Sequence, residues 1–340
     1  MRTQLTGVPE LAPDGAARAG SPAASAVAVA GLSKCYGTVQ AVRGVSFTVG
    51  HGEIFALLGP NGAGKTTILE ILEGFRTRDA GLVDVLGIDP GDRSQGRALR
   101  ERIGLVLQDI AVEPYLTVHE TIARNAGYYP APRDVGDVIG LAGLVGQERR
   151  KVRNLSGGQK RRLDLALGLI GNPELLFLDE PTTGFDPNAR RDAWDIVRGL
   201  QGSGTTILLT THYMDEAQAL ADRVAVISGG QIVAEGTPST IGGRDRARAR
   251  ISFALPGGYT TADLPLDAVP ASTGPGDGLV AVETAEPTRT LHQLTGWALA
   301  HGTVLGQLTV VQPSLEDIYL RLTGHGGPGE PEPTIEGSTR

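Results

Sequence analysis

Residues 59–67 read GPNGAGKTT and have the residue types and spacing that hold phosphate groups in proteins. The glycines allow consecutive backbone N–H groups to turn toward phosphate oxygens. Lys65, one of the chain's four lysines, would add a positive charge beside the terminal phosphates, and the Thr66 hydroxyl is a hard oxygen ligand for Mg²⁺. We therefore predict that a nucleoside triphosphate is bound by Gly59, Pro60, Asn61, Gly62, Ala63, Gly64, Lys65, Thr66 and Thr67.

The alternative for this loop is a glycine-rich turn with a surface lysine, because the chain contains 48 glycines. However, an apolar run at residues 54–58 precedes the loop, and a helical pattern at residues 67–73 follows it. A strand, a loop and a helix in this order are the setting that a phosphate-binding loop requires. The positive end of the helix dipole would then point at the phosphates.

Two adjacent carboxylates, Asp179 and Glu180, follow an apolar strand predicted at residues 175–178. Carboxylates at the end of a buried strand are costly unless a cation or a proton-transfer role compensates them. We predict that Asp179 holds Mg²⁺ and that Glu180 accepts a proton from an attacking water. The alternative is a solvated acidic turn.

Gln108 and His212 also follow predicted strands, at residues 103–107 and 205–210. Ligands of α/β folds bind at the carboxyl ends of such strands, so both side chains are candidates for a nucleotide site. Taken singly, Gln108 would be a loop residue and His212 a structural histidine. Tyr36 is a candidate platform for stacking a nucleotide base, with core packing as its alternative.

The sequence LSGGQ at residues 155–159 precedes a helical pattern that extends to Ile170. Ser156 is a candidate N-cap, so this helix would present a second anion-binding N-terminus; a glycine-rich cap without a ligand is the alternative. The preceding residues 113–154 have helical candidates at 117–127 and 135–144 and no convincing strand. This pattern predicts an inserted helical subdomain at about 109–172.

The bulk composition predicts a folded protein with one large or two ordinary domains, because 340 residues with 40% hydrophobic content can bury a core. The net charge of −7 gives no overall attraction to nucleic acid or to an anionic membrane. Cys35 is the only cysteine, which excludes an internal disulfide and fits a reducing compartment. No apolar run approaches the length of a membrane-spanning helix.

Several of these motifs occur in the order of the ATP-binding cassette: Tyr36, GPNGAGKTT, Gln108, LSGGQ, LLFLDE, residues 184–186 (GFD) and His212. Residues 30–240 therefore resemble the nucleotide-binding subunit of an ABC transporter. The resemblance implies an α/β fold with a P-loop NTPase core of ABC type and the inserted helical subdomain. Phe185 is a departure, since leucine is commoner there, and it affects the expected interface packing.

The resemblance also implies that two copies pack head to tail around ATP. Ser156 and Gly158 of one copy would then contact the γ-phosphate held by Lys65 of the other, and Gly157 and Gln159 belong to the same binding segment. Asp186 would lie at this interface, and His212 would fix the γ-phosphate. Gln108 would join Thr66 and Asp179 at the metal and sense the membrane partner.

The composition shifts beyond Ile241, where alternating residues from Arg246 onward predict a half-buried strand with a basic outer face; nucleic-acid binding is the weaker interpretation of that face. Further strands are expected at 279–282 and 304–311, with helices around Leu294 and Ile318. The closing segment resembles the drug-exporting branch of the family, including daunorubicin-resistance ATPases. We predict a disordered arm at 1–26 without a secretory signal, an ABC ATPase domain at 27–243, a small α+β accessory domain at 244–324 and a disordered tail at 325–340.

We therefore expect the ATPase of a bacterial exporter of a drug or antibiotic-like molecule, with ATP and Mg²⁺ as ligands. It would work at the cytoplasmic face of the membrane with a separate permease, which would dock on the helical subdomain and on residues 117–120. DNA-repair ATPases carry a long coiled coil where this chain has only residues 109–154, and translation factors usually carry two cassettes. An importer ATPase would differ only in its partner, and the accessory domain favours export.

Overall fold

The computed structural model describes residues 25–106, 112–267, 269–270 and 279–323. Gln108, most of the predicted arm and the predicted tail lie outside these residues. Strand β1 (Ser25–Tyr36) includes the last two residues of the predicted arm: Ser25 pairs with Gly50, and the Ala26 carbonyl accepts a hydrogen bond of 2.8 Å from the Leu86 N–H. None of the described helices is long and apolar enough to cross a membrane.

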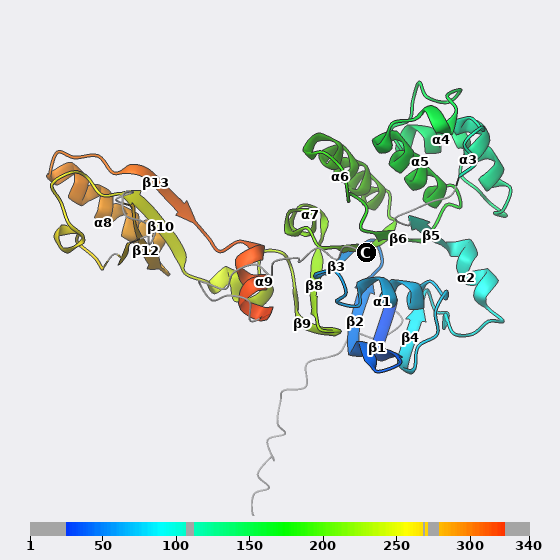
Figure 1. The fold of residues 1–340 in the computed structure, drawn as a ribbon, viewed down its shortest axis with the longest axis horizontal. Helices are drawn as coiled ribbons and strands as arrows, with labels where there is room; N and C mark the ends of the chain where they lie inside the picture. Colours follow the sequence, from blue (N-terminus) through cyan, green and yellow to red (C-terminus); the bar gives the residue numbers. More distant parts are fainter. Residues whose placement is uncertain (1–24, 107–111, 268, 271–278, 324–340) are drawn as a thin grey trace, which may run out of the picture.

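The centre of the main domain is a six-stranded sheet in the order β5-β6-β7-β3-β8-β9, parallel except for β9 (Figure 1). Strands β3, β6 and β7 are buried along their whole length, as expected of parallel strands covered on both faces. Because neighbouring parallel strands end at the same edge, the residues that follow them meet there. The strands are β3 (Ile54–Leu58), β5 (Ile103–Val106), β6 (Leu175–Asp179), β7 (Thr206–Thr211), β8 (Arg223–Ser228) and β9 (Gln231–Gly236).

A second, antiparallel sheet in the order β2-β1-β4 packs on the same core. Phe47 of this sheet stacks on Phe55 of β3, with ring centroids 5.2 Å apart. The sheet consists of β1 (Ser25–Tyr36), β2 (Val39–Gly50) and β4 (Ala80–Val85), and the helices of the main domain outside the helical subdomain are α1 (Lys65–Leu72), α2 (Gly96–Arg102), α6 (Pro187–Gly202) and α7 (Met214–Leu220).

The helical subdomain extends from one side of the central sheet (Figure 1). Thr117 and Glu120 form a capping box at the start of α3, and Asp134 caps α4, so each helix begins where its sequence supplies a cap. Ile122, Val138 and Leu163 are buried where these helices meet. The elements are short and form no coiled coil within the described residues: α3 (Val118–Ala126), α4 (Val135–Leu141), η2 (Val152–Asn154) and α5 (Gly157–Leu169).

The chain then leaves the main domain to form a small unit, called the accessory unit below, with the sheet order β11-β12-β10-β13 (Figure 1). Helix α8 packs on this sheet, and Phe253, Leu294 and Trp297 are part of their shared core. In β10 the buried residues alternate with the outer ones, as the sequence pattern predicts. The elements are η3 (Ile241–Arg246), which leads to the unit, and then β10 (Ala249–Ala254), η4 (Thr261–Asp263), β11 (Val269–Pro270), β12 (Leu279–Thr284), α8 (Pro287–Ala300) and β13 (Gly306–Val311).

Helix α9 (Leu315–Thr323) returns to the main domain and does not join the core of the accessory unit (Figure 1). Leu315 belongs to the core cluster of the central sheet, and Ile318 packs against Gly242, where an added Cβ would lie 2.5 Å from its side chain. The guanidinium of Arg321 donates a hydrogen bond of 2.7 Å to the Gly242 carbonyl. The accessory unit is therefore attached to the main domain through both of its ends.

Candidate active site

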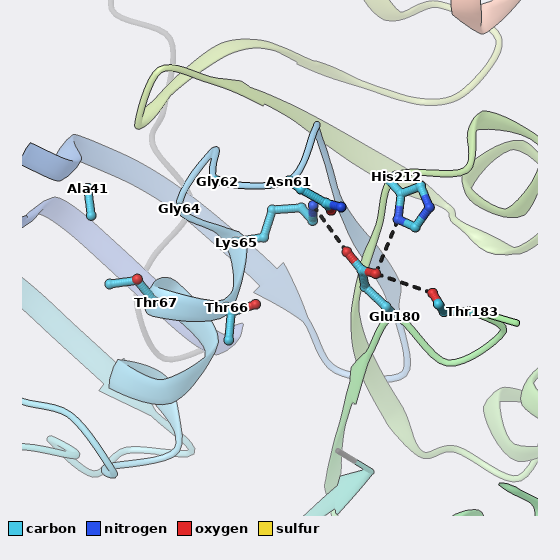
Figure 2. A pocket seen from close by; sticks show the side chains of 10 residues that line it. All are labelled: Ala41, Asn61, Gly62, Gly64, Lys65, Thr66, Thr67, Glu180, Thr183 and His212. Atoms are coloured by element: carbon cyan, nitrogen blue, oxygen red, sulfur yellow. Dashed lines mark hydrogen bonds and ion pairs between the residues drawn. The ribbon is translucent and has the colours of Figure 1, made fainter. Parts of the chain in front are cut away.

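A cavity of about 570 Å³ opens at the carboxyl ends of β3, β6 and β7 (Figure 2). The loop that joins β3 to α1 forms one wall, and the residues that follow β6 and β7 form the other. Both the predicted phosphate loop and the predicted catalytic residues contribute to it. The cavity is lined by Ala41, Asn61, Gly62, Gly64, Lys65, Thr66, Thr67, Glu180, Thr183 and His212.

Two glycines of the loop lie too close to neighbouring backbone to carry a side chain. A Cβ on Gly59 would approach the Ile227 carbonyl oxygen to 2.4 Å, and one on Gly64 would approach the Ala41 carbonyl oxygen to 2.4 Å. Gly64 also has a φ of 104°, which only glycine adopts readily. The loop can therefore take this path only with glycine at both positions.

Lys65, the first residue of α1, is almost completely buried at the end of the loop. Its ammonium group donates hydrogen bonds to the carbonyl oxygens of Gly59 at 2.7 Å and Pro60 at 3.1 Å. The same group lies 3.4 Å from a carboxylate oxygen of Glu180 (Figure 2). Burial lowers the pKa of Lys65, while the charges of Glu180 and Asp179 oppose that shift.

Asp179, the last residue of β6, directs its two carboxylate oxygens toward two hydroxyl groups. Oδ1 accepts a hydrogen bond from Thr210, and Oδ2 accepts one of 3.4 Å from Thr66. The residue is 6% exposed, so it is buried beside the phosphate loop. A carboxylate and a hydroxyl that converge in this way fit Mg²⁺, which is held by one or two protein oxygens together with substrate phosphates.

Glu180 projects into the cavity from a backbone with a φ of 48°, a left-handed conformation that is uncommon outside glycine. Its Oε2 accepts a hydrogen bond of 3.2 Å from the Thr183 hydroxyl and lies 3.2 Å from Nδ1 of His212 (Figure 2). Burial raises the pKa of Glu180, but Lys65 and His212 together lower it more, so the net pKa is below its ordinary value. The group is thus held as a carboxylate, the form that accepts a proton.

None of the LSGGQ residues lines this cavity; two of them, Gly157 and Gly158, line a second one of about 550 Å³. Ser156 caps α5: its hydroxyl accepts from the Gln159 N–H at 3.2 Å, and the Gln159 side chain accepts from the Ser156 N–H at 3.0 Å. Gly157 and Gly158 line the second cavity together with Asp186, which caps α6. Lys65 and the LSGGQ segment of one chain therefore belong to two separate cavities.

Tyr36 lies at the end of β1 and is not among the residues that line the first cavity. The residue is 39% exposed, and the Arg76 guanidinium lies 5.2 Å from the ring centre. Its role as a base-stacking platform stays a prediction, as does the role of Gln108. Gly59, Pro60 and Ala63 complete the phosphate loop without lining the cavity, and the Ala63 N–H donates to the Pro60 carbonyl at 3.2 Å.

Three residues of the site were missed by sequence reasoning. Thr183 lines both cavities and binds Glu180, and its polar side chain three residues after that carboxylate was an available signal. Thr210 binds Asp179 from the neighbouring strand. Ala41 comes from β2, where nothing in the local sequence marks it as part of a site.

Two regions of the sequence match known families. Residues 42–183 match the family described as "ABC transporter". Residues 249–314 match the family described as "ABC transporter domain-containing protein-like, C-terminal domain". The first match includes the phosphate loop, the LSGGQ segment and Glu180, and the second covers most of the accessory unit.

Several curated proteins are similar over most of their length. The chain is 37% identical over 308 residues to the daunorubicin resistance ATP-binding protein DrrA3 of Streptomyces coeruleorubidus, covering 88% of this chain and 96% of that protein. It is 36% identical over 324 residues to the daunorubicin/doxorubicin resistance ATP-binding protein DrrA of Streptomyces peucetius, covering 88% and 93%. It is 40% identical over 304 residues to the Nod factor export ATP-binding protein I of Rhizobium sp. (strain N33), covering 88% and 97%.

Solved structures show the same fold for the main domain. The structure of cbiO1 from Clostridium perfringens, part of the ABC transporter complex cbiONQ, matches with a TM-score of 0.58 and 28% identity, covering 64% of this chain and 90% of that one. An ATP-binding cassette bound to ADP and Pi, in a dimeric post-hydrolysis state, matches with a TM-score of 0.56 and 24% identity, covering 62% and 98%. The fold prediction is therefore confirmed.

Proposed function

Because the chain belongs to the ABC transporter family, as one of its ATP-hydrolysing ATP-binding proteins, we propose that it energises an exporter through a site shared between two copies. The observation that carries this proposal is the division of the predicted ATP-binding residues between two cavities of one chain. A complete site then requires Lys65 and Glu180 from one copy and Ser156 and Gly158 from another. A symmetric head-to-tail dimer supplies two such sites.

The chemistry proposed for each site is hydrolysis of the bond between the β- and γ-phosphates. Lys65 and the loop N–H groups hold the phosphates, and His212 contacts the γ-phosphate. Thr66 and Asp179 would hold Mg²⁺, which neutralises phosphate charge when bound. Glu180 accepts a proton from the water that attacks the γ-phosphorus, and the departing oxygen stays on ADP.

The names of the similar proteins support export as the direction of transport. Two of them are drug-resistance ATP-binding proteins, and another is a Nod factor export ATP-binding protein. We therefore propose that the cargo is a drug or antibiotic-like molecule and that it passes through a separate membrane permease. The chain would bind that permease at the cytoplasmic face of the membrane, and no nucleic-acid partner is proposed.

The proposed docking region is the helical subdomain together with residues 117–120. Tyr115 is 65% exposed and Tyr128 is 73% exposed, so this part of the surface offers large side chains to a partner. ATP binding would close the two copies through contacts that exist only in the closed state, and hydrolysis would reopen them. The permease would follow this cycle.

Transport into inverted membrane vesicles tests the proposal directly. Vesicles that contain the chain and the membrane protein encoded beside it should accumulate a candidate drug when ATP is added. Vesicles with the Glu180→Gln chain should bind ATP without accumulating the drug. A chain that hydrolyses ATP equally well without any membrane partner, and that copurifies with ribosomes or DNA, would contradict the exporter assignment.

A further inference from the structure

Arg161 connects the LSGGQ helix to the backbone that carries the predicted general base. It lies near the start of α5, and its guanidinium donates hydrogen bonds to the carbonyl oxygens of three consecutive residues, which begin with the last residue of β6. These are the carbonyls of Asp179 at 3.4 Å, Glu180 at 3.3 Å and Pro181 at 3.3 Å. An ion pair of 3.9 Å with Asp164 fixes the guanidinium further, and the Arg161 side chain is only 12% exposed.

The turn that Arg161 contacts needs support from its surroundings. Glu180 has a left-handed backbone, a conformation that persists in a non-glycine residue only when neighbouring groups impose it. Its N–H donates to the carbonyl and the hydroxyl oxygens of Thr210, both at 3.1 Å. Arg161 binds the carbonyl oxygens of the same turn. The direction of the Glu180 side chain is therefore set jointly by β7 and by α5.

The N-terminus of helix α5, which carries Arg161, also lies at the second cavity. Gly157 and Gly158 line the second cavity, and Arg161 lines it as well, about one helical turn further along. In the proposed dimer this N-terminus contacts the γ-phosphate that the partner copy holds. A shift of α5 on that phosphate would reach the Glu180 turn through the three hydrogen bonds of Arg161, because a helix moves as a rigid element.

We propose that Arg161 is a positioning residue that couples the two ATP sites of the dimer. When α5 of one copy engages the γ-phosphate at the first site, Arg161 holds Glu180 of that copy in its hydrolytic position at the second site. Each copy thus hydrolyses its own ATP efficiently only after its LSGGQ helix has found ATP on the partner. This inference rests on the head-to-tail dimer of the proposed function.

A purely structural role for Arg161 predicts a different result from coupling. If Arg161 only stabilised the turn, its replacement would lower activity independently of what α5 binds. Coupling instead predicts that the effects of altering Ser156 and Arg161 are not additive, which a double-mutant cycle measures. ATP affinity should be unchanged in either case because the Lys65 contacts stay intact. The effect should therefore fall on kcat and not on KM.

Mixed dimers allow the double-mutant cycle to be measured with only one of the two ATP sites active. A full-length chain with Glu180→Gln carries one affinity tag, and a second full-length chain that retains Glu180 carries a different tag. The mixed dimer is purified through both tags. Only the second chain can hydrolyse ATP. Ser156→Ala is then placed in that second chain, where it weakens the contact of its α5 with the other chain's ATP and leaves its own site complete.

With Arg161 present, Ser156→Ala in the active chain should lower kcat by about tenfold, within the usual range for coupling between sites. With Arg161→Lys in the same chain, kcat should already be low, and Ser156→Ala should lower it less than about twofold further. Arg161→Gln provides a second variant. The matched control is Arg162→Lys, since Arg162 binds the Gly143 carbonyl and Asp192 instead; here the tenfold loss should remain.

The inference is overturned if Ser156→Ala costs the same factor with Arg161 and with its replacements, or costs nothing when Arg161 is present. Melting temperature and nucleotide affinity of each single chain verify that the variants are folded. A mixed dimer without any ATP hydrolysis, or a failure to form ATP-dependent dimers, would instead contradict the proposed function itself, and this inference with it.

Discussion

At the residue scale, the Glu180 carboxylate at the end of β6 lies beside two basic side chains. The Lys65 ammonium lies 3.4 Å from Glu180, and His212 lies 3.2 Å from the same carboxylate. The two basic groups keep Glu180 ionised despite its burial, and Thr183 fixes one of its oxygens. Glu180 is thus available as a base at neutral pH and has a defined direction, which are the two properties that general-base catalysis requires.

Replacement of Glu180 by Gln should separate ATP binding from hydrolysis. The amide has nearly the same shape but cannot accept the proton, so hydrolysis should fall by about 10²-fold or more. The loop contacts of Lys65 do not depend on this charge, so ATP-dependent dimers should persist in gel filtration. Glu174→Gln, at the other end of β6 where Glu174 binds Arg102, is the matched control with ordinary activity. Hydrolysis by Glu180→Gln at the wild-type rate would exclude Glu180 as the base.

Glu73 provides a second test because it is 3% exposed at the end of α1. Burial, with the charges of Asp179 and Glu70 added, raises the pKa of Glu73 to about 8. Between about pH 4.5 and pH 8, Glu73 therefore keeps a proton in the folded protein that it has already lost in the unfolded chain. The contribution of Glu73 to the free energy of unfolding is therefore fully present below the pKa of the unfolded chain. It is lost as the pH rises through the pKa of the folded protein.

Glu73→Gln should remove this pH dependence because the amide stays neutral. In urea unfolding, the variant and the wild type should be similar near about pH 5, and the variant should be more stable by on the order of 4–5 kcal/mol near about pH 9. Glu101→Gln is the control, since the Glu101 side chain is 33% exposed and pairs with Arg97. Equal stability differences at both pH values would show that Glu73 is ionised in the folded protein.

At the scale of secondary-structure elements, helix α9 connects the accessory unit back to the main domain. It follows the accessory unit in the sequence, yet Leu315 and Ile318 are each 1% exposed against the main domain. Arg244 of η3 reinforces this contact by donating a hydrogen bond of 2.8 Å to the Pro313 carbonyl. The accessory unit is thus held between η3 and α9, so its position depends on both connections.

Ile318→Ala should therefore destabilise the main domain. Truncation of a buried isoleucine to alanine typically costs about 2–5 kcal/mol, here because the space against Gly242 is left unfilled. Leu320→Ala on the same helix is the control, since Leu320 is 37% exposed and its loss should cost far less. The loss of ATP binding with increasing urea measures the stability of the main domain in both variants. A main domain that unfolds at the wild-type urea concentration in Ile318→Ala would show that α9 is not part of its core.

For the whole molecule, the division of the proposed site between two cavities makes activity depend on association. The specific ATPase activity of the isolated chain should rise with protein concentration until the dimer is saturated, because a monomer offers only half of each site. Phosphate release over a dilution series, compared with gel filtration in ATP, measures this. Constant specific activity at concentrations where the chain is monomeric would mean that one copy hydrolyses ATP alone.

The local motifs could be predicted because neighbouring residues encode them. The phosphate loop, the carboxylate pair after β6, the cap of α5 and the alternation in β10 each depend on a few consecutive residues. The resemblance that these motifs carry also placed the core fold. Helices α6 and α7 and strands β8 and β9 were not anticipated, because no chemical motif directed attention to them.

The sequence by itself thus determined that residues 59–67, Glu180 and His212 should meet at one sheet edge, since parallel strands end on the same side. Only the tertiary structure decided which distant residues join them. Ala41 and Thr210 come from other strands, Arg161 reaches the Glu180 turn from α5, and α9 folds back past the whole accessory unit. These contacts join segments far apart in the chain, and local residue patterns carry no information about such pairings.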